Sequence, residues 1–166
     1  MTLLGATVAT PWKPMSLIVD AASAPTVVAA AFIPLPALAR KAGIAARTIT
    51  PDNALEGVTE VVARYLDGDL DAFDAVDVRQ PGGPFMQDCW AALRTVRAGT
   101  VVSYAELAAL AGRPKAVRAA GTACATNLIA PVIPCHRVVR TGGDVGNYGF
   151  GVPLKVALLK FEGAHD

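Results

Sequence analysis

The chain has 166 residues, of which 53% are apolar, and a formal net charge of +1. This length accommodates one large domain or two small ones, and the composition is that of a globular rather than a disordered protein. No uninterrupted apolar run is long enough to cross a bilayer, so no association with a membrane is expected.

The cysteine content and the first residues indicate a reducing compartment. Residues 1–4 lack the basic and apolar regions of a signal peptide. The three cysteines, at positions 89, 124 and 135, form neither a disulfide framework nor a paired metal-binding motif, and with two histidines they have no zinc spacing. We therefore expect a cytoplasmic protein without a metal or cofactor.

The small net charge conceals an uneven distribution of charge along the chain. Residues 1–90 carry six Lys/Arg and ten Asp/Glu, whereas residues 91–140 carry seven Lys/Arg and one acidic residue, Glu106. The basic segment is suited to contact phosphates. Charge alone is equally compatible with a solvated basic surface.

The first half of the chain has the pattern of a small α/β module. Three runs rich in apolar and β-branched residues, at 3–10, 15–21 and 26–33, are separated by prolines and predict strands. Residues 53–66 place their apolar side chains on one side of a helix. The module ends near residue 80, because the next four residues, Pro-Gly-Gly-Pro, are the clearest linker in the chain.

The second half has a helical pattern and contains a candidate helix-turn-helix. Ser103 and Glu106 have the spacing of a capping box, which predicts the start of a helix that ends at Gly112. Pro114 fits the first turn of a second helix, from Lys115 to about residue 125. Any helical hairpin has a similar pattern. A last helix begins at residue 153.

The second helix of this pair has small residues and cations on its expected outer face. Such a face lets a backbone approach a duplex groove closely, although tight packing against a neighbouring helix needs the same small residues. We expect Val117, Ala120, Gly121 and Cys124 to face inward, and Lys115, Arg118, Ala119 and Thr122 to face outward.

The sequence Pro-Cys-His-Arg-Val at residues 134–138 is the strongest chemical signal. A cysteine reacts as the thiolate, which a base or a nearby cation promotes, and His136 and Arg137 supply both beside Cys135. Neighbouring side chains of an extended segment point to opposite faces, so a bridging water or a turn is needed to link Cys135 and His136. Glu162 is available to orient His136. The other two cysteines fit buried, unreactive positions.

These residues closely resemble the O6-alkylguanine-DNA alkyltransferases, also called methylated-DNA–protein-cysteine methyltransferases. The resemblance runs from about Phe85 to Gly163. Residues 65–73 also resemble the N-terminal half of the family, whereas residues 1–50 resemble it only weakly. It rests on the Pro-Cys-His-Arg-Val core and on Ser103, Tyr104, Arg118, Asn127, Asn147, Tyr148 and Glu162.

The resemblance implies a fold and a reaction. It implies an N-terminal ribonuclease-H-like α/β domain, expected at residues 1–80, and a mostly α-helical winged helix-turn-helix domain at residues 85–166. The family reverses damage by flipping the nucleotide and moving an alkyl group, mainly methyl, from O6-alkylguanine or O4-alkylthymine in double-stranded DNA to a cysteine. We expect a monomer that is consumed in a single turnover.

The resemblance also implies roles for single residues. Cys135 accepts the alkyl group, while His136 is a water-mediated base held by Glu162. Asn127 orders the site. Tyr104 and Arg118 help to flip the nucleotide, and Arg118 fills the vacated stack. Further DNA contacts are implied for Ala105, Arg113 and Thr141, and the guanine pocket for Tyr104, Val138, Tyr148, Gly149 and Phe150.

Two departures from the family pattern carry expectations. Phe150 stands where many members have glycine and some bacterial members a bulky aromatic residue, so we expect methyl groups to react better than large alkyl groups. The zinc ligands of some vertebrate members are absent, which agrees with a metal-free protein.

Two other classes of protein compete with this interpretation. A non-catalytic alkyltransferase-like protein would bind lesions without repairing them, but such proteins lack the acceptor cysteine. A cysteine hydrolase would need an oxyanion hole and would turn over repeatedly.

Overall fold

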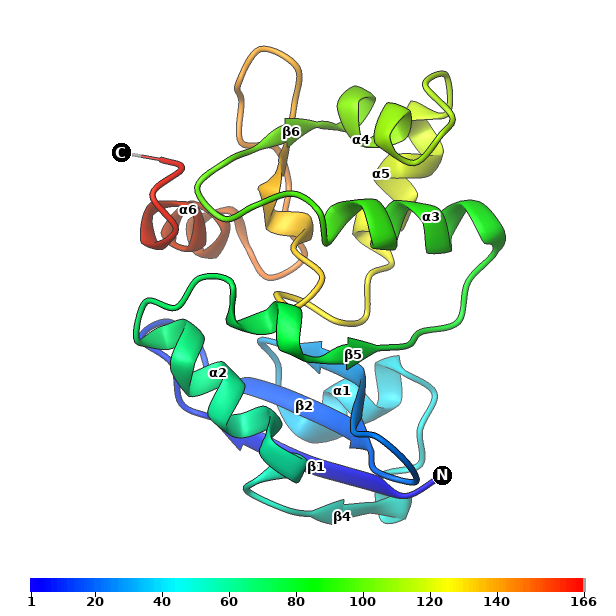
Figure 1. Cartoon of the computed structure of the whole chain (residues 1–166), viewed down its shortest axis with the longest axis vertical. Coiled ribbons are helices and arrows are strands. Elements are labelled where there is room, and N and C mark those ends of the chain that lie inside the picture. The colour runs from blue at the N-terminus through cyan, green and yellow to red at the C-terminus, as the bar shows by residue number, and fades with distance from the viewer. Residues whose placement is uncertain (166) are drawn as a thin grey trace. The chain divides into compact units, whose positions relative to one another are not determined.

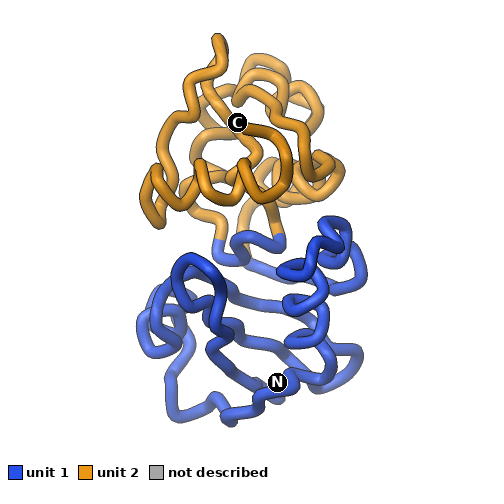
Figure 2. Tube along the Cα trace, turned by 90° about the vertical axis from the view of Figure 1, so that its left-hand side faces the viewer, with its two compact units in different colours: residues 1–80, 128–132 blue, residues 81–127, 133–166 orange. Residues whose placement is uncertain are grey.

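The computed structural model describes residues 1–165 and divides them into two compact units (Figure 1, Figure 2). Unit 1 comprises Met1–Gln80 and Leu128–Val132, and unit 2 comprises Pro81–Asn127 and the residues from Ile133 onward. The first boundary falls in the Pro-Gly-Gly-Pro linker. The division differs from the predicted domains at residues 128–132, which return to unit 1 from the middle of unit 2.

Unit 1 is built on a five-stranded mixed sheet with the order β4-β1-β2-β3-β5. Consecutive strands β1, β2 and β3 pair antiparallel, and the short edge strands β4 and β5 pair parallel with β1 and β3. The three predicted strands are confirmed. They are β1 Leu3–Val8, β2 Met15–Asp20 and β3 Thr26–Ala31. The two edge strands are β4 Ile49–Pro51 and β5 Asp77–Val78.

Helices cover both faces of this sheet, which explains why all six residues of β2 are buried. In Figure 1, α1 (Leu35–Lys41) lies behind the strands and α2 (Val58–Leu66) in front of them. Short 3₁₀ turns at Ala46–Thr48, Leu55–Gly57 and Ala72–Ala75 connect these elements.

The helix predicted over residues 53–66 begins later, at Val58. The Asp52 carboxylate accepts hydrogen bonds from the backbone N–H groups of Ala54 and Leu55, at 2.9 and 3.1 Å. Leu55 and Glu56 also have positive φ angles of 49° and 54°, which a right-handed helix does not accommodate. A local side-chain turn therefore replaces the first helical turn.

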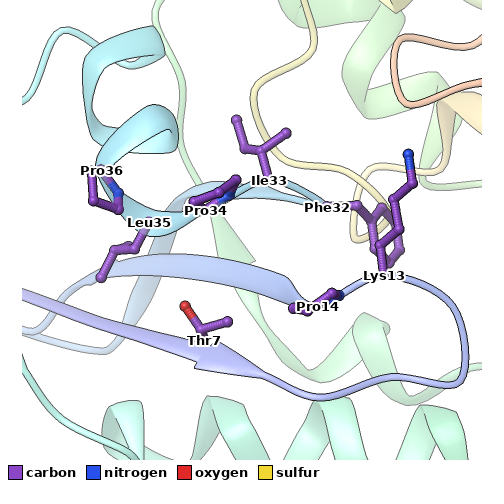
Figure 3. Close-up of a pocket in the computed structure, with 8 residues that line it drawn as sticks. All are labelled: Thr7, Lys13, Pro14, Phe32, Ile33, Pro34, Leu35 and Pro36. Carbon is purple, nitrogen blue, oxygen red and sulfur yellow. The ribbon is translucent and has the colours of Figure 1, made fainter.

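Unit 1 carries an open, mostly apolar hollow of about 540 Å³ between the β1–β2 hairpin and the start of α1 (Figure 3). Its lining includes three prolines, and the side chain of Thr7 provides a hydroxyl group. The lining residues are Thr7, Lys13, Pro14, Phe32, Ile33, Pro34, Leu35 and Pro36.

The described residues of unit 2 form four helices and a two-stranded parallel ribbon. The Trp90 indole N–H donates to the Ala123 carbonyl at 2.9 Å, which joins α3 to α5. The elements are α3 Pro84–Leu93, β6 Val102–Ser103, α4 Tyr104–Leu110, α5 Val117–Ala125, a 3₁₀ turn Cys135–Arg137, β7 Val138–Val139 and α6 Val152–Phe161.

The ends of α4 follow the predicted signals. Ser103 and Glu106 form the capping box, with bonds of 3.0 and 3.1 Å. Gly112, with a φ of 92°, follows the helix, and the N–H of Arg113 reaches back to the carbonyl of Ala108 at 2.9 Å. This is the arrangement of a Schellman motif, in which glycine takes the left-handed position.

The start of α5 differs from the prediction. Pro114 lies within a turn closed by the Ala116 N–H and the Arg113 carbonyl at 2.9 Å, a position that favours proline, and the helix begins only at Val117. Val117, expected to face inward, is therefore in the first turn and 38% exposed. The prediction for Ala120 is confirmed, because Ala120 and Ala123 form the buried face, while Gly121 and Cys124 are half-buried.

The segment Leu128–Val132 is tied to unit 1 by backbone and side-chain bonds. The Ala30 N–H donates to the Leu128 carbonyl at 2.8 Å, and the Ala130 N–H donates to the Ala30 carbonyl at 3.0 Å. The Leu128 N–H donates to the side-chain oxygen of Gln80 at 2.9 Å. No helix within residues 1–165 is both long and apolar enough to cross a membrane.

Candidate functional site

Cys135, His136 and Arg137 form a single 3₁₀ turn and are all buried. The Cys135 N–H donates to the Ile133 carbonyl at 2.9 Å, and the Arg137 N–H donates to the Pro134 carbonyl at 3.0 Å. The sequence predicted that either a bridging water or a turn links Cys135 and His136, and the structure has the turn.

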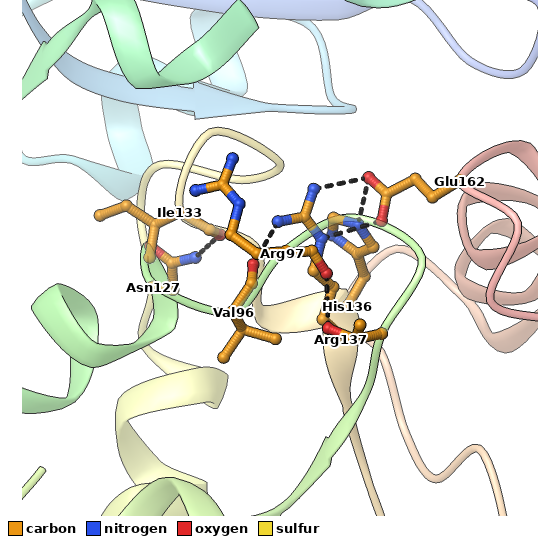
Figure 4. Close-up of polar contacts among 8 residues, drawn as sticks. Val96, Arg97, Asn127, Ile133, His136, Arg137 and Glu162 are labelled. Atoms are coloured by element: carbon orange, nitrogen blue, oxygen red, sulfur yellow. Dashed lines mark hydrogen bonds and ion pairs between the residues drawn. The ribbon is translucent and has the colours of Figure 1, made fainter. Parts of the chain in front are cut away.

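Glu162 binds both His136 and Arg137 inside unit 2 (Figure 4). Its Oε2 lies 3.0 Å from His136 Nε2, and its two oxygens accept from Arg137 Nε and Nη2 at 2.8 and 2.9 Å. Arg137 Nη1 donates to the Val96 carbonyl at 2.6 Å. Glu162 directly follows the last residue of α6, so this helix brings it to the turn.

These contacts set the protonation states of the pair. Burial alone would raise the pKa of Glu162, but the hydrogen bonds from His136 and Arg137 hold that pKa far below its usual range. Burial lowers the pKa of His136 despite the opposing effect of Glu162. A neutral His136 facing a carboxylate carries its proton on Nε2, which leaves Nδ1 as the basic nitrogen. Within the described residues, the buried Nδ1 has no hydrogen-bond partner.

Asn127 fixes the chain immediately before the cysteine. Its side-chain N–H donates to the Ile133 carbonyl at 2.8 Å, and the same carbonyl accepts the Cys135 N–H. Asn127 is buried and lies just after α5. The helix pair and the cysteine turn are therefore connected through one buried amide.

Lys155 is a residue of this site that the sequence reasoning missed. Its side chain is fully buried, and its Nζ donates to the carbonyls of Val138 and Asn147 at 2.6 and 3.1 Å. Burial lowers its pKa, and the nearby Cys135 and Cys124 thiols act in the opposite direction. A signal was present, because Lys155 lies on the same helix face as the core residues Leu158 and Leu159.

The predicted base-pocket residues lie around this turn. The rings of His136 and Tyr148 are 6.5 Å apart at 72°, and those of Tyr148 and Phe150 are 5.2 Å apart at 80°, both edge-to-face. Val138 is fully buried, Gly149 is exposed, and Tyr104, Tyr148 and Phe150 are half-buried. Burial raises the pKa of Tyr104, and the Cys124 and Cys135 thiols add to this effect.

The residues predicted to contact DNA are exposed on unit 2 rather than gathered in the buried cluster. Arg118 lies in the first turn of α5, and the Arg113 guanidinium carbon is 5.7 Å from the Phe85 ring centre. The exposed residues of this set are Ala105, Arg113, Arg118 and Thr141.

The other two cysteines lie on two helices of unit 2. Cys89 is fully buried in α3, where burial raises its pKa. Cys124 is half-buried, and burial, with Cys135 nearby, raises its pKa strongly. Both thiols are therefore kept protonated at neutral pH, as unreactive cysteines are.

Comparison with known proteins places this geometry in a family. Residues 84–164 match the family described as "6-O-methylguanine DNA methyltransferase, DNA binding domain". A methylated-DNA–protein-cysteine methyltransferase of Mycobacterium tuberculosis is 41% identical over 114 residues, which cover 68% of each chain. The solved structure of a variant of the M. tuberculosis O6-methylguanine methyltransferase has a TM-score of 0.79 and 32% identity, over 99% of this chain and 94% of that one.

This chain belongs to the methylated-DNA–protein-cysteine methyltransferase family. The matched stretch covers less than two thirds of the length of some relatives. The Escherichia coli bifunctional transcriptional activator/DNA repair enzyme Ada is 45% identical over 109 residues, which are 66% of this chain but 30% of that protein. A Salmonella typhimurium methyltransferase of the family is 41% identical, over 64% of this chain and 63% of its own length.

Members of the methyltransferase family with solved structures share the mixed sheet and helices seen here. One M. tuberculosis member, with a TM-score of 0.79 and 31% identity over 97% of this chain and 93% of its own, was solved in complex with DNA.

Proposed function

We propose that this protein repairs DNA directly, by moving an alkyl group, mainly methyl, from O6-alkylguanine to the Sγ of Cys135. O4-alkylthymine is the second expected substrate. The observation that carries this proposal is the buried turn in which Cys135 precedes a neutral histidine whose other nitrogen is fixed by a carboxylate. A cysteine beside an oriented base is the arrangement of an activated nucleophile.

The reaction balances with the groups at this turn. The Cys135 thiol proton passes through a bridging water to His136 Nδ1, and Glu162 stabilises the ring as it becomes charged. The sulfur forms a bond to the alkyl carbon as the bond between that carbon and O6 breaks. The electron pair of the broken bond passes to the guanine, which takes up a proton from solvent and stays in the DNA as the normal base, while His136 returns its proton to solvent. A thioether remains on Cys135, so each molecule reacts once.

Lys155 supports the thiolate in this scheme. It is a buried cation near Cys135, and the interaction between the two favours the charged form of each. By binding the Val138 and Asn147 carbonyls, Lys155 also holds the loop that follows the turn in place. We assign it a positioning and electrostatic role.

Double-stranded DNA is the proposed partner, bound by unit 2. In this proposal unit 2 is a winged helix-turn-helix that places α5 in the minor groove, and unit 1 is a ribonuclease-H-like domain. The exposed Arg118 on α5 and the basic charge of residues 91–140 support this. The O6 atom of a paired guanine lies within the stack, so the nucleotide must be flipped, at a cost of a few kcal/mol. We propose that a monomer acts, in a reducing compartment that keeps the thiol free.

The experiment follows a labelled methyl group from O6-methylguanine in a duplex. We expect the label to appear on the protein, in an amount that never exceeds one per molecule. Cys135→Ser should abolish the transfer while leaving DNA binding intact, because the nucleophile is separate from the groove contacts. Label that stays on the DNA while the protein binds it would favour a lesion-binding protein. Release of free methanol with repeated turnover would favour a hydrolase.

A further inference from the structure

The ribbon of unit 2 brings the backbones of Tyr104 and Arg140 close together. Strands β6 and β7 pair parallel, with Ser103 opposite Val139. The next residues on the two strands are Tyr104, at the start of α4, and Arg140, which follows the cysteine turn and β7. Paired strands lie about 4.8 Å apart, so the backbone delivers a tyrosine and an arginine to the same place.

The side chain of Arg140 packs against a glycine, Gly146. A carbon at the Cβ position of Gly146 would lie 3.4 Å from Arg140 Cγ, 3.7 Å from Arg140 Nε and 3.8 Å from Lys155 Nζ. Gly146 also has a φ of 75°, which favours glycine. Two cationic side chains therefore approach the same glycine, one from the surface and one from the buried site.

The charge of Arg140 is not neutralised by a neighbouring acid within residues 1–165. Asp144 is the nearest acidic residue along the chain, and its Oδ1 accepts from the Gly146 N–H at 3.3 Å instead. The Arg140 backbone is bound, with its N–H donating to the Asp144 carbonyl at 2.9 Å, while its side chain is exposed. Lys155 already donates to two carbonyls, so Arg140 is the cation that remains available to a ligand.

The electrostatic effects of these groups agree with their placement. Burial raises the pKa of Tyr104, and among the charged neighbours Arg140 acts in the opposite direction. Arg140 also lowers the pKa of Lys155, whose pKa Cys135 raises. Arg140, Tyr104, Lys155 and the acceptor cysteine thus share one electrostatic neighbourhood.

We propose that Arg140 binds the phosphodiester of the nucleotide whose base enters the Cys135 site, beside Tyr104. The proposal rests on the proposed function. An anion placed here relieves the repulsion between Arg140 and Lys155, and the planar guanidinium matches the geometry of a phosphate. Arg140 is then a positioning residue, because it holds the extruded nucleotide by its backbone and does not touch the reacting atoms.

The test combines a protein variant with a backbone variant of the DNA. The rate at which Cys135 is methylated is measured for wild type and Arg140→Ala on four substrates. These are a duplex containing O6-methylguanine, the same duplex with one uncharged methylphosphonate on the 5′ side of the lesion, the same duplex with one on the 3′ side, and free O6-methylguanine. We expect Arg140→Ala to slow the reaction with the normal duplex about tenfold or more.

The same loss is expected in wild type when the contacted phosphate is made neutral, and Arg140→Ala should then have no further effect. The reaction with the free base should be unchanged. Arg140→Lys should recover part of the rate, and Lys160→Ala, which removes an exposed cation from α6, should leave the rate at the wild-type value.

Three results would overturn the proposal. If Arg140→Ala and the methylphosphonate slow the reaction by independent factors that multiply, at both positions of the methylphosphonate, then Arg140 does not contact either phosphate. If Arg140→Ala slows the reaction with free O6-methylguanine as much as the reaction with the duplex, then Arg140 acts on the acceptor site itself. If none of the substrates methylates Cys135 in the wild type, that result contradicts the proposed function itself, and the proposal for Arg140 fails with it.

Discussion

Glu162 determines where the proton of His136 resides and how the buried Arg137 is neutralised. Its carboxylate takes one bond from the ring and two from the guanidinium. Removing one partner of a buried ion pair is expensive, because it leaves an uncompensated charge. Glu162 therefore serves the stability of the turn and the tautomer of the base with the same two oxygens.

Glu162→Gln should destabilise the protein by about 3 kcal/mol at pH 7 and slow methylation of Cys135. The folded-state pKa of Glu162 is lower than the value in the unfolded chain, so its stabilising effect is present above about pH 4.3 and is lost as the pH falls below it. Urea unfolding of both proteins at pH 7 and in steps below pH 4.5 measures this. A stability difference that stays constant over that range would contradict the assignment.

Phe150 lies against Tyr148, whose ring faces His136, and we expect it to restrict the alkyl pocket. Wild type should react efficiently with O6-methylguanine and poorly with O6-benzylguanine, because the ring adds bulk beside the acceptor. Phe150→Gly should improve the benzyl reaction and leave the methyl reaction nearly unchanged. The rates of Cys135 alkylation by both compounds test this. Rapid benzyl transfer in wild type, unaffected by the variant, would show that Phe150 points away from the pocket.

At the level of elements, α5 carries the exposed cation Arg118, and a buried amide just after α5 holds the cysteine turn. Arg118 is exposed on the first turn of α5, and Asn127 directly follows the last turn region of the same helix. The helix that we propose to contact the duplex is therefore continuous with the residue that orders the acceptor turn.

Arg118→Ala should slow repair of duplex DNA much more than repair of single-stranded DNA. A flipped base leaves a gap in a duplex stack, which the arginine fills, whereas a single strand has no such gap. Comparing the methylation rates of Cys135 on both substrates measures the difference. Equal slowing would reduce Arg118 to a phosphate contact, for which the salt dependence of binding would fall instead.

Gln80 should hold the returning segment in unit 1, since its side chain is buried and accepts the Leu128 N–H at 2.9 Å. Gln80→Leu leaves that N–H without its acceptor, which should destabilise the protein by about 1–3 kcal/mol and speed hydrogen exchange at Leu128. Gln87→Leu, on the exposed side of α3, is the control and should change stability by less than about 0.5 kcal/mol. Equal effects of the two variants would contradict the role of Gln80.

The elements that local signals control could be predicted, and those that depend on distant contacts could not. The capping box at Ser103 and the glycine at 112 fix α4 by themselves. By contrast, the start of α2 depends on hydrogen bonds that the Asp52 carboxylate accepts, and the buried face of α5 depends on contact with Trp90. The starts of α2 and α5 were predicted too early for the same reason. The spacing of apolar residues indicates a helix but not the residue at which its first turn begins.

The candidate site follows the same rule. The Pro-Cys-His-Arg-Val sequence singles out the nucleophile and its neighbours, but nothing in it indicates that Lys155 bonds the carbonyls around the turn. Its position on the core face of α6 indicates that Lys155 is buried, but not which groups its ammonium contacts. Only the folded chain shows that the loop carbonyls of Val138 and Asn147 converge on it.

On the scale of the whole molecule, the polypeptide chain passes through both units before it forms the cysteine turn. The chain leaves unit 2 after Asn127, runs through unit 1 from Leu128 to Val132, and returns to form the cysteine turn. Sequence patterns treat residues 85–166 as continuous, because the return is held by one isolated bridge to Ala30 and by the side chain of Gln80, which no local pattern records.

The central claim is that Cys135 is the one residue that accepts the alkyl group, permanently and once. The most direct measurement is peptide mapping by tandem mass spectrometry after incubation with excess duplex containing O6-methylguanine. We predict that the peptide with Cys135 gains the mass of one CH₂ group in nearly every molecule, that Cys89 and Cys124 stay unmodified, and that Cys89→Ala and Cys124→Ala still react. Methylation of another residue, or repaired DNA with an unmodified Cys135, would contradict the account.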